Sequence, residues 1–311
     1  MSNKLIYPKP LRKNSTIGLI CPAGGFVDYK PVDLVVNYLY KLGYKVKLGK
    51  SIITPVNSYE YLSASDENRL LDLHNFFCDN TIDAIFCLRG GYGSLRIVED
   101  IDYKLIKRNK KLFLGFSDIT ILLLAFYSRA GLLTFHGPLL GINFLNKNRN
   151  PKNKKSADNL WKLLQDPKYN FSYFNRSNGY VIYPGKCRGN LLGGNLTDIC
   201  AMLGSGLLPS FKNSILFLED CYEEPYRIDR LLMQLKNAGI FKEVNGLVFS
   251  SFYKCKFKSN NQIASLLKDM IADCNIPTIL NFPIGHDLKN YTVPIGTNVV
   301  LDADNIALYS V

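Results

Sequence analysis

The first half of the chain alternates short apolar segments with helix-like segments, and this order constrains the fold more than any other feature. Segments typical of strands, several of them ending in glycine, are 16–24, 44–49, 82–94 and 111–118. Helical spacing of apolar residues separates them at 31–43 and 66–79. Strands joined through helices form a parallel, doubly wound sheet. We therefore predict an α/β fold with such a sheet in the N-terminal half.

Two glycine-containing segments lie at the ends of predicted strands. "RGGYG" occupies residues 89–93 and "GFSD" occupies residues 115–118. In open parallel sheets, ligands bind in the crevice at the carboxyl ends of the strands. Both segments are therefore predicted to border a functional site.

The second half reads as a separate, β-rich domain. Its predicted elements are a glycine turn into a helix at 189–196, a strand at 214–220, a helix at 226–241, a strand at 244–252 and a closing β-hairpin or pair of strands at 292–311. We expect an N-terminal domain at 1–145, a linker at 146–185 that contains a helix at 156–166, and a C-terminal domain at 186–311.

Composition predicts a globular protein. The chain has 311 residues, of which 47% are hydrophobic and 21% charged, and its apolar runs are too short to span a bilayer. The N-terminal segment lacks the apolar stretch of a secretory signal, so we expect a cytoplasmic protein. The eight cysteines are scattered singly, and the three histidines do not fall at metal-ligand spacing. We therefore expect reduced cysteines and no metal.

The formal net charge of +12 raises the question of an anionic macromolecular partner. The lysines are spread along the chain or gathered in residues 146–155, where no aromatic residue is interleaved with them. Binding of single-stranded nucleic acid usually combines basic and aromatic side chains. We therefore predict neither a nucleic-acid partner nor a membrane partner.

Ser117 is the candidate nucleophile. It lies between the strand-like run "LFLGF" and the helix-like run "ITILLLAFY", which is the strand–turn–helix context of a nucleophile elbow. The N–H of the next residue, Asp118, could then face an oxyanion at the start of the helix. The alternative is that Ser117 or Asp118 only caps the helix. The segment lacks the second glycine of the G-x-S-x-G pattern, so the local motif alone favours capping.

A serine nucleophile needs a base and a group that orients the base. His286 follows Pro-x-Gly in "FPIGHD", and a loop of that kind can project an imidazole into a cleft, so His286 is the best candidate base. His74 lies within a predicted helix and His136 at a strand end. Glu219 and Asp220 end the predicted strand "SILFLED". Side chains alternate along a strand, so only one of the two can orient the histidine. A strand-end turn, or an acid that caps the following helix, is an equal alternative for these residues.

Six blocks together resemble the LD-carboxypeptidase family of serine peptidases, which includes murein tetrapeptide carboxypeptidases and microcin C immunity peptidases. The blocks, in order, are "KPLRKNSTIGLICPAGG", "LRGGYGSLRIVEDIDY", "LGFSDIT" with "LLTFHGPL", "RGNLLGGNLTDICAMLGS", "LFLEDCYEEPYRIDRLLMQLKNAGIF" and "FPIGHDLKNYTVPIG". The resemblance implies Ser117 as nucleophile, His286 as base and Glu219, rather than Asp220, as the residue that orients the base.

The same resemblance implies further properties of the site and the fold. The N–H groups of Asp118 and Gly91 would form the oxyanion hole. Candidate substrate contacts are Arg89, Tyr92 and His136, with Arg96 a second candidate, beside Arg89, for binding a carboxylate. The implied fold has a Rossmann-like N-terminal domain, a β-rich C-terminal domain and a cleft between them. The implied substrate is the murein tetrapeptide of cytoplasmic peptidoglycan recycling, cleaved by a homodimer without metal or cofactor.

Three other functions stay open. A microcin-immunity-like peptidase would cleave aminoacyl-nucleotide amides and would need an aromatic pocket for the nucleobase. A nucleotide-binding module would rest on residues 89–93 alone, but these lack the Lys-Ser/Thr ending of a P-loop and do not match G-x-G-x-x-G. A non-catalytic binding protein is the third alternative, and the presence of all three candidate catalytic residues makes it the weakest.

Overall fold

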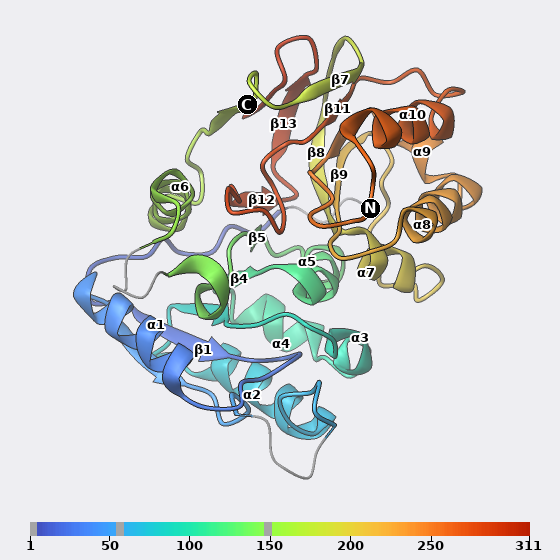
Figure 1. Ribbon diagram of the computed structural model, residues 1–311. Coiled ribbons are helices and arrows are strands. Elements are labelled where there is room, and N and C mark those ends of the chain that lie inside the picture. The colour runs from blue at the N-terminus through green and yellow to red at the C-terminus, as the bar shows by residue number, and fades with distance from the viewer. Residues whose placement is uncertain (1–4, 54–58, 146–150) are drawn as a thin grey trace.

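The computed structural model describes residues 5–53, 59–145 and 151–311. Within these ranges the chain forms a six-stranded and an eight-stranded sheet, each packed against helices (Figure 1). The prediction of an α/β fold, with a doubly wound parallel sheet and a second, β-rich region, is confirmed. None of the helices in the described part of the chain is both long and apolar enough to cross a membrane.

The first sheet has the strand order β12-β5-β4-β3-β1-β2. Its strands are β1 (Thr16–Ile20), β2 (Lys45–Leu48), β3 (Ala84–Cys87), β4 (Leu112–Gly115), β5 (Thr134–His136) and β12 (Val293–Ile295). β1 to β5 are parallel, and β12 pairs antiparallel with β5. Every residue of β3 and β4 is buried, which explains why these central strands are continuous apolar runs.

Helices connect and cover the strands of the first sheet. They are α1 (Lys30–Lys41), α2 (Asp66–Cys78), α3 (Ser94–Ile97), α4 (Tyr103–Arg108), α5 (Thr120–Ala125) and, after this sheet, α6 (Lys154–Gln165). The Ser65 side chain caps α2 by accepting a hydrogen bond from the Asn68 N–H. A π-helical turn at Phe126–Ala130 continues α5, and a second one spans Leu140–Phe144. These helices follow the predicted alternation and leave the carboxyl ends of β3 and β4 open to the second half.

The second sheet has the order β6-β14-β13-β8-β9-β10-β11-β7. Its strands are β6 (Ser172–Phe174), β7 (Tyr180–Tyr183), β8 (Lys186–Asn195), β9 (Ser214–Glu219), β10 (Gly246–Phe249), β11 (Thr278–Leu280), β13 (Asn298–Asp302) and β14 (Ala307–Ser310). β8 to β11 are parallel, and the flanking strands are antiparallel. Its helices are α7 (Leu196–Ala201), α8 (Pro225–Asn237), α9 (Ile240–Glu243) and α10 (Asn260–Met270).

Three details differ from the sequence prediction. Residues 189–195 belong to the long strand β8 rather than to a turn, and the helix α7 begins only at Leu196. The predicted linker, whose residues 146–150 lie outside the described residues, contributes both edge strands of the second sheet, β6 and β7. Within the predicted closing hairpin, β13 and β14 do pair with each other, but β12 leaves to complete the first sheet. The proposed domain boundaries stay a prediction.

The two sheets meet where β8 ends beside the start of α5. The Asn195 N–H donates to Thr120 Oγ1 at 3.0 Å, and a Cβ on Gly194 would lie 2.5 Å from the same oxygen. α5 follows directly on the "GFSD" segment of the first sheet. This close contact therefore brings the carboxyl ends of the parallel strands of the two sheets to one place.

Candidate active site

Ser117 lies on a sharp turn between β4 and α5. Its backbone has φ +61°, a left-handed conformation that is uncommon and strained for a residue other than glycine. A 3₁₀ turn over Ser117–Ile119 leads into α5. The turn directs the serine hydroxyl into the cavity between the two sheets, which is the arrangement expected for a nucleophile elbow rather than for a simple helix cap.

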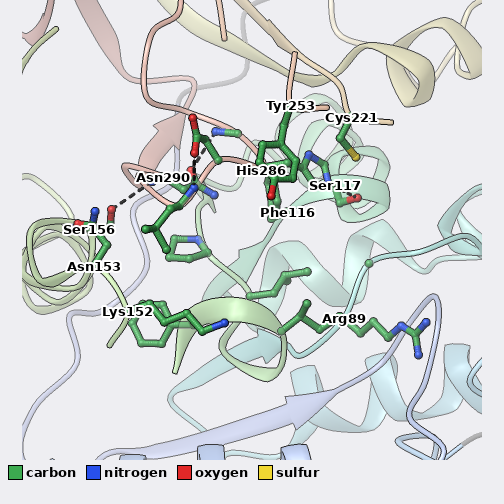
Figure 2. Close-up of a pocket in the computed structure, with 18 of the residues that line it drawn as sticks. Arg89, Phe116, Ser117, Lys152, Asn153, Ser156, Cys221, Tyr253, His286 and Asn290 are labelled. Carbon is green, nitrogen blue, oxygen red and sulfur yellow. Dashed lines mark hydrogen bonds between the residues drawn. The ribbon is translucent and has the colours of Figure 1, made fainter. Parts of the chain in front are cut away.

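His286 and Glu219 reach Ser117 from the second half of the chain. His286 Nε2 lies 3.2 Å from Ser117 Oγ, and His286 Nδ1 lies 2.6 Å from Glu219 Oε2. Glu219 ends β9, and His286 is on the loop after β11. Gly285 (φ +147°) allows this loop to approach closely, because a Cβ there would lie 3.1 Å from Glu219 Cβ. Three side chains that are distant in sequence therefore form one serine–histidine–carboxylate chain (Figure 2).

The environment of His286 makes it a stronger base than a free imidazole. Burial lowers the pKa of His286, but the charge of Glu219 and the hydrogen bond to it outweigh burial, so the pKa is raised above its ordinary value. Glu219 is fully buried, and Asn195 Nδ2 donates to its second oxygen, Oε1, at 3.2 Å. Glu219 is thus fixed with one oxygen on the histidine and the other on Asn195.

The neighbouring carboxylate, Asp220, points elsewhere. Its Oδ2 accepts from the Thr197 N–H at 3.1 Å and from the Thr197 hydroxyl at 2.8 Å, while its Oδ1 accepts from the Cys221 N–H at 2.8 Å. Burial, with a contribution from Glu219, raises the pKa of Asp220 to about 6. Strand alternation therefore separates the two acids as expected, and Glu219 is the one that contacts the histidine.

The glycine loop after β3 lies directly against the nucleophile. A Cβ on Gly90 would be 2.8 Å from Ser117 Cβ, so only glycine permits this approach. The next residue, Gly91 (φ +98°), lines the same cavity as Ser117. The loop is therefore close enough to the serine for a backbone N–H to take part in binding an oxyanion.

The Asp118 side chain connects the elbow to this loop. Its carboxylate accepts the Gly93 N–H at 3.2 Å and the Ser94 N–H at 2.9 Å. Burial raises the pKa of Asp118, although these hydrogen bonds oppose the shift. Because the two N–H groups are already used by Asp118, they are not free to cradle a phosphate, which weighs against a nucleotide-binding role for "RGGYG".

Arg69, on α2, holds the same loop from the other side. Its guanidinium is fully buried and donates to the carbonyl oxygens of Gly93 (2.9 Å) and Pro22, and to the carboxylate of Asp66. The Gly93 peptide unit and its neighbours are thus fixed by a carboxylate and a guanidinium. Sequence reasoning missed these roles of Arg69 and of the Asp118 carboxylate, because both depend on tertiary contacts that no local pattern shows.

Ser117 and His286 open into a cavity of about 610 Å³. Its lining comes from both halves of the chain: Arg89, Gly90, Gly91, Phe116, Pro138, Leu139, Ile142, Phe144, Lys152, Asn153, Ser156, Cys221, Tyr222, Tyr253, Gly285, Asp287, Leu288 and Asn290, besides the two named residues. In Figure 2, Ser117, His286, Cys221 and Tyr253 lie together, apart from Lys152, Asn153 and Ser156. Sequence reasoning had not singled out the lining side chains within 138–144 and 152–156, nor those of Tyr222 and Tyr253.

Three of the proposed substrate contacts lie outside the cavity lining. His136 is fully buried between the rings of Phe116 and Phe217, and burial lowers its pKa to about 4. This corrects the expectation that His136 contacts substrate. Tyr92 is exposed and packs against Tyr61.

Arg96, the third of these residues, pairs with the carboxylate of Asp66 at 2.7 Å and does not line the cavity. Of the substrate contacts proposed from the sequence, Arg89 alone borders the cavity. His74 is likewise remote from the site, where its Nε2 accepts the Asp102 N–H at 3.1 Å.

Among the described residues, the side chains at the site form no cluster suited to a metal. Within residues 5–53, 59–145 and 151–311, no group of three or more His, Cys, Asp or Glu side chains is arranged to hold an ion. The described side chains at the site supply a hydroxyl, an imidazole and a carboxylate in contact with one another.

Comparison with known proteins identifies the family of the chain. Residues 17–137 match the LD-carboxypeptidase N-terminal domain and residues 188–301 the LD-carboxypeptidase C-terminal domain. A Bacillus subtilis (strain 168) protein named "Probable murein peptide carboxypeptidase" is 36% identical over 95% of this chain and 91% of its own length. A Pseudomonas aeruginosa murein tetrapeptide carboxypeptidase is 30% identical over 93% of this chain and 94% of its own.

A solved structure of a microcin C7 self-immunity protein superposes with a TM-score of 0.88 and covers 98% of both chains. Its sequence identity is 23%, so the likeness shows a common fold. The two domain matches together span more than half of the described chain. The chain belongs to the LD-carboxypeptidase family of serine-type carboxypeptidases.

Proposed function

We propose that the protein releases the terminal D-alanine from the murein tetrapeptide L-Ala-γ-D-Glu-diaminopimelate-D-Ala. The observation that carries the proposal is the continuous Ser117–His286–Glu219 contact at the wall of the cavity. Family membership and the murein-directed names of two relatives support this choice of substrate. The bond cleaved is the amide between an L-configured centre and a C-terminal D-residue.

The first step is acylation of Ser117. His286 Nε2 takes the proton from Ser117 Oγ, and the oxygen attacks the scissile carbonyl carbon. Glu219, buried and bonded to Nδ1, stabilises the imidazolium that forms. When the C–N bond breaks, the imidazolium gives its proton to the leaving amine, and D-alanine departs.

The second step is hydrolysis of the acyl-enzyme. His286 takes a proton from water as the water oxygen attacks the ester carbonyl, and it returns that proton to Ser117 Oγ when the C–O bond breaks. The products are D-alanine and the tripeptide. In both steps the carbonyl oxygen becomes negatively charged, and we assign its stabilisation to the backbone N–H groups of Asp118 and Gly91. Donors fixed in advance on a glycine loop and at a helix start are suited to this role.

The resemblance also supports a setting for the reaction. We propose a cytoplasmic homodimer that acts in peptidoglycan recycling, since the tetrapeptide is a product of murein turnover. Sedimentation of the purified chain at several concentrations tests the dimer, which should persist at micromolar concentration.

A second candidate function has one observation in its favour. Tyr222 and Tyr253, which line the cavity near His286, pack edge to face with 5.8 Å between ring centroids, and exposed aromatic rings could stack on a nucleobase. The substrate would then be an aminoacyl-nucleotide amide. Trp161 does not contribute to such a pocket, because it packs on Tyr38 and Tyr44 in the core.

D-alanine release from the synthetic tetrapeptide tests the proposed function. The purified wild type should release D-alanine with or without a chelator, and Ser117→Ala should reduce the rate by at least about 1,000-fold, because it removes the nucleophile. His74→Gln is a matched control: a histidine far from the cavity is changed, and the rate should stay the same. An aminoacyl-nucleotide amide in parallel separates the two candidates.

Two results would contradict the proposal. A folded wild type that leaves the tetrapeptide intact and cleaves the nucleotide amide would favour the second function. Release that survives Ser117→Ala would remove Ser117 as the nucleophile.

A further inference from the structure

Arg89 is a cation at the catalytic cavity without a carboxylate partner among the described residues. It is partly buried and lines the cavity together with Gly90 and Gly91. The one hydrogen bond that its guanidinium makes within those residues is to the carbonyl oxygen of Gly25, and its carbon lies 5.9 Å from the centroid of the Phe26 ring. A guanidinium has five N–H donors in a planar fork, so most of them can still bind an anion.

Arg96 shows that the local structure can neutralise an arginine when no ligand is involved. It lies in α3, which follows the same glycine loop, and pairs with the Asp66 carboxylate at 2.7 Å. Arg96 is outside the cavity, whereas the unpaired Arg89 is at its wall. The arginine left without a carboxylate is therefore the one that a substrate can reach.

The charges around the cavity favour an anion near Arg89. Among the described residues of its lining, the charged side chains besides Arg89 are those of Lys152 and Asp287. Asp287 is on the exposed loop after the base, and its carboxylate accepts the Leu288 N–H at 2.6 Å. Figure 2 shows Arg89 and Lys152 on opposite sides of the view, with the Arg89 guanidinium directed away from Ser117. Arg89 is thus the cation associated with the glycine loop.

The position of Arg89 matches a specific group of the proposed substrate. In a peptide, the carbon of the terminal carboxylate lies about 3 to 4 Å from the scissile carbonyl carbon, because only one residue follows the bond. The Arg89 backbone adjoins Gly90, which touches Ser117, so the Arg89 side chain starts beside the nucleophile. A planar guanidinium binds a carboxylate through two parallel hydrogen bonds.

We propose that Arg89 binds the free α-carboxylate of the terminal D-residue and thereby restricts cleavage to the last peptide bond. This inference rests on the proposed function and adds to it the chemical group that the enzyme requires next to the scissile bond. It predicts that the protein is selective for C-terminal carboxylates over uncharged C-termini of the same size.

The test compares the tetrapeptide with its C-terminal D-alaninamide. Both yield the same tripeptide, whose formation gives kcat/KM for each substrate, and their ratio does not depend on the fraction of active enzyme. The wild type should prefer the acid by about 10- to 100-fold, the usual effect of a hydrogen bond between charged groups. Arg89→Gln should lower kcat/KM for the acid by a similar factor. Its kcat/KM for the amide should stay within about twofold of the wild-type value, so that the preference for the acid disappears.

Two further variants complete the experiment. Arg89→Lys keeps the charge without the planar fork and should retain part of the preference for the acid, and it serves as the main variant if Arg89→Gln does not fold. Arg96→Gln, the matched control, should keep the full preference.

Each contrary outcome has a separate meaning. If Arg89→Gln lowers kcat/KM for both substrates equally, or if the wild type cleaves acid and amide equally well, the role of Arg89 is overturned and the proposed function stands. If the wild type cleaves neither substrate, the proposed function fails, and this inference fails with it.

Discussion

The nucleophile side and the base side of the site are held by different kinds of contact. Ser117 and the glycine loop follow neighbouring strands, β4 and β3, and the Asp118 carboxylate joins them through two backbone N–H groups. Glu219 and His286 come from β9 and from the loop after β11, and a single side-chain contact of 2.6 Å joins them.

Because of this difference, the nucleophile side should control the geometry of the oxyanion site, and the base side should control the protonation of His286. On the nucleophile side, the contacts fix backbone positions, so a substitution there should change how well an oxyanion fits. On the base side, the contact joins a carboxylate to an imidazole that titrates, and the pKa of His286 is raised by it. The pH dependence of catalysis should therefore arise on the base side.

The largest effect is expected from Glu219→Gln. The change keeps the shape of the side chain but removes the charge that holds the imidazolium, and kcat/KM should fall by about 1,000- to 10,000-fold. His286 acts as a base only when neutral, so wild-type kcat/KM should fall as the pH drops through its raised pKa. Without the charge of Glu219, burial lowers that pKa, and the fall of the residual activity should move to lower pH.

A profile of kcat/KM from about pH 5 to 9, a range that spans the ordinary histidine pKa, measures this shift. The nearby Asp220 carboxylate also favours protonated His286, so the profile of Asp220→Asn belongs in the same series. A residual activity that declines at the same pH as the wild type would show that Glu219 does not set the pKa of the base.

An intermediate effect is expected from Asp118→Asn on the nucleophile side. The oxygen of the new amide would accept a hydrogen bond from one of the two backbone N–H groups that now bind the carboxylate. The NH₂ group of the amide would face the other N–H, and two donors cannot pair. The glycine loop should shift, and kcat should fall by about 10- to 100-fold with little change in KM. A tetrahedral boronate analogue should lose affinity in the same proportion as kcat/KM.

Asp102→Asn is the matched control for this loop variant. Asp102 caps α4 by accepting the Leu105 N–H at 2.9 Å, and it does not line the cavity, so kcat should be unchanged. If Asp118→Asn lowered only the amount of folded protein, analogue affinity would stay at the wild-type level, and a positioning role for Asp118 would be refuted.

The smallest effect on activity is expected from Asp220→Asn, which should instead change stability. The pKa of Asp220 is raised to about 6 in the folded state, so the folded protein binds this proton more tightly than the unfolded chain. The stabilisation is complete below the unfolded pKa of about 4 and is lost as pH rises through about 6.

Urea unfolding of both proteins at pH 4 and pH 7 measures this linkage. The free energy of unfolding of Asp220→Asn minus that of the wild type should be higher at pH 7 than at pH 4 by about 2 to 3 kcal/mol. The kcat of the variant should change less than tenfold. Equal differences at the two pH values would mean that Asp220 has an ordinary pKa in the folded protein.

The sequence predicted the parts of the molecule that depend on short-range patterns. Strand-like runs located β1 to β4, the turn at Ser117 stood at the end of a predicted strand, and the Pro-x-Gly sequence before His286 indicated a loop. The local pattern could not choose between Glu219 and Asp220. The resemblance chose Glu219, and the structure gives the physical reason, since Asp220 is occupied by Thr197 and by the Cys221 N–H.

Features that depend on long-range pairing could not be predicted in this way. "TFHGP" is compatible with a pocket histidine and with a core histidine, and the packing of His136 against Phe116 and Phe217 decides for the core. The short strands β6 and β7 acquire their structure by pairing with β14 and β11. An isolated strand of three or four residues has no such partner, so its local sequence gives little indication of it.

The return of β12 to the first sheet has a consequence for the order of events on the ribosome. β1 to β5 leave the ribosome early, but the partner that covers the edge of β5 is residues 293–295, which emerge after almost all of the second half. Until then β5 presents an open edge, the kind of surface on which chains stick to one another. A separately supplied peptide that carries β12 should therefore bind a fragment that lacks it.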